Sequence, residues 1–122
     1  MPTALLVALG GALGALARWG LGVGLARWLG ETAPWGTWAA NALGCLLIGI
    51  ALPLVAADHP RRAVAVVGFL GAFTTFSTYT AETLALWEAG RPALAAANAA
   101  GSVLVGLAVC GVGLWIGRAL AA

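Results

Sequence analysis

Hydroxyl side chains are concentrated in one short stretch of an otherwise apolar sequence. Six of the seven residues in the range Thr74 to Thr80 carry a hydroxyl group. They lie near the middle of an apolar segment from about Ala63 to Trp87, which at about 1.5 Å per residue is long enough to cross a bilayer. Two glycines just before this stretch, Gly68 and Gly71, and its Thr pair are poor helix formers. We therefore expect the backbone to break near Gly71 to Thr74, which would leave carbonyl and amide groups free to bind an ion.

A small set of other polar side chains is also predicted to lie within the membrane. The set comprises Arg18, Thr37, Asn41, Glu82, Asn98 and Ser102. Placing polar groups at that depth costs free energy, so these residues are candidates for function, although Ser and Thr often only form hydrogen bonds between helices. Amide N–H groups, hydroxyls and the positive edges of Phe73, Phe76 and Tyr79 suit a small anion stripped of its water. A cation pathway would show rings of acidic side chains instead. Carbonyls freed at the backbone break could separately hold a monovalent cation.

The composition of the chain places these residues in a membrane. A chain of 122 residues that is 62% hydrophobic and 8% charged, with a mean hydropathy of +1.00, has too much apolar surface for a soluble core of this size. We predict an all-α integral membrane fold, a single domain over residues 1–122. Its four spans are expected at about Ala4–Leu25, Trp35–Ala57, Ala63–Trp87 and Ala93–Gly117. Since no basic, cleavable leader precedes the first span, that span is expected to be transmembrane rather than a signal peptide.

Small and aromatic residues predict how the spans pack. Glycine and serine recur at helical spacing and would let helix backbones approach closely. These faces are Gly10 with Gly14, Gly20 with Gly24, and Ser102, Gly106, Gly113 with Gly117. Because four spans bury little among themselves, some of these faces are expected to contact a partner subunit. Five of the six tryptophans lie at span ends and predict an aromatic belt: Trp28, Trp35, Trp38, Trp87 and Trp115.

The arginines give almost no preference for one orientation in the membrane. Four spans place Arg61, Arg62 and Arg118 on one side, and Arg27 and Arg91 on the other. Arg18, near the far end of the first span, reduces the difference further. By the positive-inside rule the chain is therefore expected to insert both ways and to assemble head to tail.

Enzymatic and nucleic-acid functions find no support in the sequence. The single histidine, His59, lies in a connector, and neither a zinc-protease helix motif nor a serine-hydrolase elbow is present. Cys45 and Cys110 lie within predicted spans without a partner motif and are expected to be packing residues. Six scattered arginines form no basic patch for nucleic acid. We expect a protein that is not an enzyme.

Three motifs stand out in the first three spans: Gly10-Gly11-x-x-Gly14-Ala15-x-x-Arg18, Gly36-Thr37-x-x-x-Asn41-x-x-Gly44, and Gly68-Phe69-x-Gly71-x-Phe73-Thr74-Thr75-Phe76-Ser77-Thr78-Tyr79-x-x-Glu82. In these motifs, and along its whole length, the chain resembles the Fluc (CrcB) fluoride channels. The third motif is the specific one, because it places a Thr-Thr-Phe-Ser-Thr-aromatic run in the middle of a span. The resemblance implies a multi-pass protein of the cell inner or plasma membrane that exports fluoride passively and lowers cytoplasmic fluoride.

The same resemblance implies the assembly and the site. The chain would form an antiparallel, dual-topology homodimer with a broken third helix, two fluoride pathways and a structural sodium ion (Na+) at the dimer centre. The implied pathway residues are Asn41, Phe76, Ser77, Thr78, Tyr79 and Ser102. The vestibule would hold Glu82 and Arg18, and the backbone carbonyls of Gly71 and Thr74 would bind the sodium. Two positions depart from the family, in which Tyr79 is often Phe and the position of Asn98 is often Tyr.

Two other functions stay open. A small, dual-topology, proton-coupled multidrug exporter would have the same length and number of spans, but it needs a titratable carboxylate deep in the membrane. The only acid within a predicted span is Glu82, which lies towards one end. A structural subunit of a larger membrane complex would conduct nothing. Passive fluoride efflux, compared with chloride efflux and proton-driven dye export, separates the three.

The polar residues all lie on one side of the predicted membrane midplane. Measured from the centre of its own span, each of Arg18, Asn41, Phe76, Tyr79, Glu82 and Ser102 is displaced by roughly 2–11 Å. Every displacement points towards the first and third connectors. One protomer is therefore expected to line only half of a crossing, which an antiparallel copy would complete.

Overall fold

The structure is a computed structural model that describes residues 2–122, so the first residue of the predicted domain, Met1, lies outside it. The described residues are helical, with short connectors and no strand. The helices are α1 (Thr3–Leu29), α2 (Trp35–Leu54), α3 (Pro60–Arg62), η1 (Ala63–Leu70), α4 (Gly71–Phe73), α5 (Ser77–Glu88), α6 (Pro92–Ala96), η2 (Ala97–Gly101) and α7 (Ser102–Ala121). Four segments are long and apolar enough to cross a membrane: Thr3–Leu29, Trp35–Leu54, Pro60–Glu88 and Pro92–Ala121. The prediction of an all-helical, four-span membrane protein is confirmed.

The ends of the spans differ slightly from the prediction. The second span ends at Leu54 rather than Ala57, and the connector that follows is held by hydrogen bonds within itself. In that connector the Arg62 side chain donates to the carbonyl of Val55 (3.2 Å), and the amide of Arg61 donates to the imidazole of His59 (3.1 Å). His59 therefore caps the short helix α3, which is a structural role for the only histidine.

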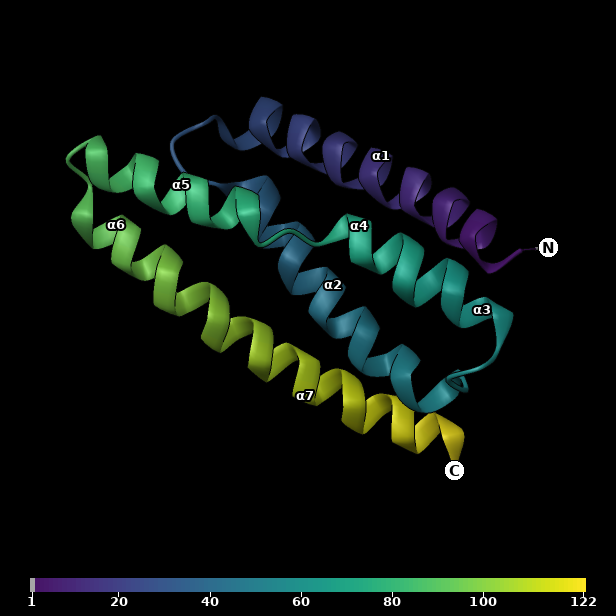
Figure 1. Ribbon diagram of the computed structural model, residues 1–122. Coiled ribbons are helices and arrows are strands. Elements are labelled where there is room, and N and C mark those ends of the chain that lie inside the picture. The colour runs from purple at the N-terminus through teal and green to yellow at the C-terminus, as the bar shows by residue number, and fades with distance from the viewer. Residues whose placement is uncertain (1) are drawn as a thin grey trace.

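The four spans are arranged in pairs. The most extensive contact joins α2 and α7, and α1 lies along η1 and α4 (Figure 1). Beyond residue 76 the third span leaves α1, and α5 packs against α6 and η2 of the fourth span. The N- and C-termini lie at the same end of the molecule, opposite the first and third connectors (Figure 1). The two halves of the third span therefore have different neighbours.

Close glycine contacts fix these pairs. A Cβ atom at Gly14 would lie 2.2 Å from the carbonyl oxygen of Phe69, and one at Gly113 would lie 2.3 Å from that of Leu46. Neither helix could hold its position with a larger residue at these points. The remaining predicted face, Gly20 with Gly24, has no neighbour within 4 Å among the described residues.

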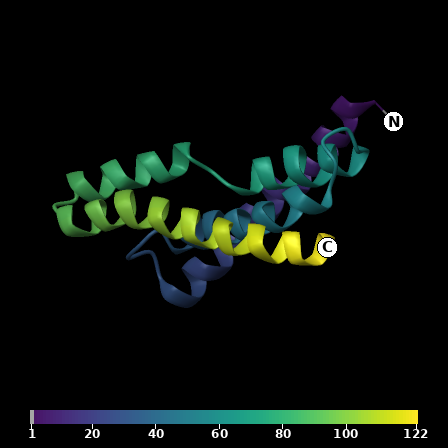
Figure 2. The same ribbon diagram turned by 90° about the horizontal axis from the view of Figure 1, so that it is seen from below.

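The third span is not helical at three residues. Helix α4 ends at Phe73, Thr74 has an extended backbone (φ −87°, ψ 159°), and α5 begins at Ser77. Figure 2 shows this stretch as a thin, non-helical segment between two helical segments. We call residues 74–76 the linker. Gly71, which was included in the expected break, is still helical.

Two stretches of the third and fourth spans, η1 and η2, are wound as π-helix. In this winding a carbonyl pairs with the amide five positions further along the chain, and π-helical turns are frequently found at functional sites. The sequence analysis did not predict it. In the fourth span it surrounds Asn98, which becomes the centre of a buried cluster described below.

Many large apolar side chains are exposed, as expected for a protein that meets lipid or another subunit. Trp28, Trp87 and Trp115 are exposed, in agreement with a place in an aromatic belt. Trp38 is half-buried, and its place in the same belt stays a prediction. Its indole N–H donates inward to the side chain of Asn98, because the rotation of α2 is set by its packing against α7.

Candidate functional site

Asn41 holds the middle of the linker. Its Nδ2 donates to the carbonyl of Thr75 (2.9 Å), and its Oδ1 accepts from the amide of the same residue (2.8 Å). The amide side chain thus pairs with both backbone groups of Thr75, as a neighbouring strand would. A buried backbone group without a hydrogen-bond partner costs on the order of 1–3 kcal/mol, and the membrane core offers no water to replace that partner. One N–H of Asn41 stays free for another acceptor, because Nδ2 carries two hydrogens.

The linker also leaves the carbonyls of Gly71 and Thr74 without their helical partners. In a continuous helix the amide of Thr75 would bond to the carbonyl of Gly71, but it donates to Asn41. The amide of Thr78 would bond to the carbonyl of Thr74, but it donates to the hydroxyl of Thr75 (3.3 Å). Carbonyl oxygens are the usual ligands of monovalent cations in membrane proteins. The carbonyls of Gly71 and Thr74 therefore fit a sodium ion chemically, although two oxygens are too few to enclose one.

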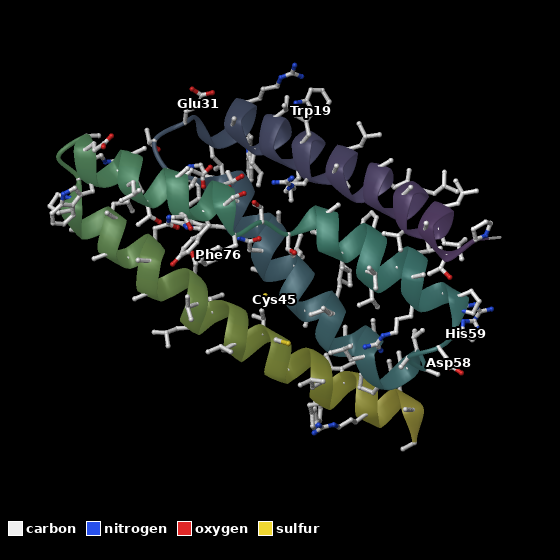
Figure 3. The ribbon with its side chains drawn as sticks, viewed as in Figure 1. Trp19, Glu31, Cys45, Asp58, His59 and Phe76 are labelled. Carbon is white, nitrogen blue, oxygen red and sulfur yellow. The ribbon has the colours of Figure 1, made fainter. Side chains whose placement is uncertain are left out.

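A groove of about 600 Å³ lies between the linker and the fourth span. Its lining includes most of the predicted pathway residues, namely Asn41, Phe76, Tyr79 and Ser102, together with the predicted sodium residues Gly71 and Thr74. Phe76 is 78% exposed, and its ring lies 5.6 Å from that of Tyr79 at an interplanar angle of 41°. Figure 3 shows Phe76 directed away from α2 beside the linker. The described lining contains hydroxyl, amide, thiol and apolar groups and no carboxylate.

Tyr79 presents its ring rather than its hydroxyl to this groove. The hydroxyl donates to the carbonyl of Ala99 (2.6 Å), which lies in the π-helical stretch η2. A tyrosine hydroxyl has a single hydrogen, so this bond commits it. The hydroxyl of Tyr79 therefore serves the contact between α5 and η2, while the ring edge stays available at the groove.

A second cavity, of about 860 Å³, lies on the other side of the linker. It is walled by the first and third connectors, and its lining includes the predicted vestibule residues Arg18 and Glu82 with Thr75 and Thr78. We call it the connector cavity. Thr75 lines both the groove and the connector cavity, so the linker is the partition between them. Thr75 was predicted only as part of the hydroxyl run, and its position between the two spaces was not predicted.

Glu82 is held by the second span. Its Oε1 accepts from the hydroxyl of Thr37 (3.0 Å), and Thr37 is itself buried. Its Oε2 is buried without a hydrogen-bond partner among residues 2–122. At the mouth of the cavity, Arg91 donates to the carbonyl of Thr32 and ties the third connector to the first.

Two predicted pathway residues lie outside the groove. Thr78 lines the connector cavity, and its hydroxyl accepts from Thr75 (3.2 Å), so its own hydrogen is free to be donated. Ser77 is exposed at the start of α5 and lines neither space. Their assignment to an ion pathway stays a prediction.

Asn98 is the centre of a buried polar cluster that joins three spans. It is 0% exposed and contacts Trp38, Thr83 and Ser102 through hydrogen bonds. Asn98 was predicted as an intramembrane polar residue and as a departure from the family, whereas the roles of Trp38 and Thr83 were not predicted. One signal was present, since Trp38 lies three residues before Asn41 and so falls on the same side of α2.

These features define a small multi-pass membrane protein with polar spaces on both sides of a non-helical linker. The chain belongs to the family described as CrcB-like protein, Camphor Resistance (CrcB), whose sequence pattern matches residues 5–114. The resemblance stated from the motifs is confirmed.

Several relatives carry the name fluoride-specific ion channel FluC. One from Thermus thermophilus is 47% identical over 119 residues, covering 95% of this chain and 94% of the relative. One from Rhizobium leguminosarum bv. trifolii is 40% identical over 125 residues, covering 99% and 100%. One from Methylococcus capsulatus is 45% identical over 121 residues, and there the match spans 94% of this chain but only 50% of the relative's length.

Proposed function

We propose that this protein is a fluoride-selective ion channel of the cell inner membrane, through which fluoride leaves passively. The observation that carries the proposal is the chemistry of the groove. Asn41 and Ser102 bring an amide and a hydroxyl to it, Phe76 and Tyr79 bring aromatic rings, and its described lining has no carboxylate. Relatives of nearly the same length that are named fluoride channels support the same function.

This donor set suits fluoride for a physical reason. A small anion loses its hydration shell in a narrow space, and N–H groups, O–H groups and the positive edges of aromatic rings replace that shell. In a low-dielectric environment each such contact is stronger than in water, and a carboxylate on the path would repel the ion. Asn41 lines the groove and Thr78 lines the connector cavity, so each space has a residue with a hydrogen left to donate.

The connector cavity is proposed to be the vestibule. Its lining carries three arginines and two glutamates, so its charge is net positive. A positive, partly enclosed cavity raises the local concentration of anions. Arg18 and Glu82 are proposed to act here, with Thr37 holding Glu82 in place.

The complete channel is proposed to be an antiparallel homodimer. In one protomer the polar side chains of the linker, the groove and the connector cavity occupy the half of the crossing nearer the first and third connectors. A second copy, related by a two-fold axis in the membrane plane, would supply the other half and give two equivalent pathways. The nearly balanced arginines support insertion in both orientations.

The same symmetry supports the sodium proposal. Each copy offers the carbonyls of Gly71 and Thr74, so two copies meeting at the axis would offer four oxygens to one sodium ion. Such an ion would place a fixed positive charge near both pathways. Metal analysis of the purified dimer, with sodium replaced by a large organic cation in one sample, tests this directly.

Flux measurement in proteoliposomes tests the function. We expect passive fluoride efflux, retention of chloride, and no export of a cationic dye driven by a proton gradient. Dye export without fluoride efflux would support the proton-coupled exporter instead, and the absence of all three fluxes would support a structural subunit. Either result would refute the channel.

A further inference from the structure

Asn98 does not line the groove, but the Ser102 hydroxyl that is hydrogen-bonded to it does. Ser102 is part of the groove lining, whereas Asn98, Trp38 and Thr83 are not. The four side chains come from α2, α5, η2 and α7, so the cluster connects the second, third and fourth spans. Of the four side chains, the Ser102 hydroxyl is therefore the one through which the cluster can act directly on an ion in the groove.

The direction of each hydrogen bond in the cluster follows from the chemistry of the groups. An indole N–H can only donate, so Trp38 must face the oxygen of the Asn98 amide, Oδ1. Nδ2 then faces the hydroxyl of Thr83 (2.8 Å), which gives its own hydrogen to the carbonyl of Tyr79 (2.7 Å). The Ser102 hydroxyl lies 3.2 Å from the same Oδ1 and must donate to it. Trp38 and Ser102 therefore share one acceptor.

Sharing has a consequence for an anion in the groove. As the structure stands, the hydrogen of Ser102 points away from the groove, towards Asn98. To bind an anion, Ser102 must rotate and remove its hydrogen from Oδ1. Because Trp38 still donates to Oδ1, that buried oxygen keeps a partner after the rotation. Without the indole N–H the rotation would leave a fully buried acceptor unpaired, which is the costly case for a hydrogen bond.

We propose that Trp38 and Asn98 are positioning residues that keep the Ser102 hydroxyl free to turn towards an anion in the groove. This inference rests on the proposed channel function and extends it to residues that do not line the path. The cost of losing the indole N–H falls on the anion-bound state alone. It therefore changes the fluoride concentration needed for half-maximal flux, rather than only the number of folded channels.

The test is a mutant cycle in proteoliposomes with fluoride flux measured over a range of concentrations. Trp38→Phe removes the N–H and keeps a large aromatic ring. We expect it to raise the half-saturating fluoride concentration about five- to tenfold. In the Ser102→Ala background, which has no hydroxyl to turn, Trp38→Phe is expected to cause no further rise. In the Ser102→Thr background, which keeps the hydroxyl, the rise should return.

Trp115→Phe is the matched control, because that indole is 72% exposed on the outside of α7. It is expected to leave the half-saturating concentration unchanged. An unchanged half-saturating concentration in Trp38→Phe overturns the positioning role, even if maximal flux falls through loss of folded protein. An equal rise with and without the Ser102 hydroxyl also overturns it. Absence of fluoride flux in the unaltered protein would refute the proposed function itself, which is a distinguishable result.

Discussion

Replacing Asn41 is expected to unfold the linker locally and to stop conduction. In Asn41→Leu both backbone groups of Thr75 lose their partner, at 2.8 and 2.9 Å in the structure. An unpaired buried backbone group costs about 1–3 kcal/mol, so the pair would cost about 2–6 kcal/mol in total. That is a large fraction of the stability of a typical domain, about 5–15 kcal/mol.

Asn41→Asp separates the structural effect from the electrostatic one. The carboxylate can still accept from the amide of Thr75 but no longer donates to its carbonyl, so only one backbone group is orphaned. We expect a folded dimer with about half the loss of stability and with fluoride flux suppressed by the negative charge in the groove.

Hydrogen exchange over residues 74–80, thermal unfolding in detergent and fluoride flux are the measurements for both variants. The expected order of exchange rates is Asn41→Leu fastest, Asn41→Asp intermediate and the unaltered protein slowest. Unchanged exchange in Asn41→Leu would show that this side chain does not hold the linker. Normal flux in Asn41→Asp would remove Asn41 from the route.

Three further changes test packing, the cation and the groove. Gly14→Ala should destabilise the contact between α1 and the third span by forcing a Cβ atom against the Phe69 backbone, whereas Gly24→Ala, with open space around it, should be neutral in thermal unfolding. Gly71→Val should abolish dimer formation while the protomer still folds, because a Cβ at Gly71 meets only the Val66 carbonyl, at 3.8 Å, within its own chain. A normal dimer on size-exclusion chromatography would contradict the proposal that Gly71 lies at the dimer axis. Phe76→Ile should suppress fluoride flux without changing dimer stability, since it removes only an exposed ring edge.

The sequence predicts the spans because hydropathy and length depend on composition. It also predicts that the third span is interrupted near its hydroxyl run, since weak helix formers are a local property. It could not predict that Asn41 pairs with Thr75, because the two residues are 34 positions apart and only the packing of α2 beside the linker brings them together. The break consequently falls at the residues that Asn41 supports, a few positions beyond Gly71.

The environment of a tryptophan near a span end could not be predicted from the sequence either. Trp28 and Trp38 both lie near connectors, yet Trp28 is exposed and Trp38 donates to buried Asn98. The difference is one of helix rotation, which is set by close contacts such as that of Gly113 with the Leu46 backbone rather than by distance from the membrane surface. Composition alone assigns both residues to the interface.

Orientation in the membrane gives the strongest test of the whole assembly. Two or three lysines added to the second connector, beside Arg61 and Arg62, should fix that connector on the cytoplasmic side in every copy. The same lysines in the third connector should fix the opposite orientation.

Each orientation-locked variant alone could form only parallel pairs, in which both copies line the same half of the crossing. We therefore expect either variant to be inserted and folded but silent in fluoride flux, and the two expressed together to recover it. Accessibility of a terminal tag reports the orientation of each variant independently of flux. If one locked variant conducted fully by itself, a single orientation would be sufficient to build the pore, and the antiparallel arrangement would be refuted.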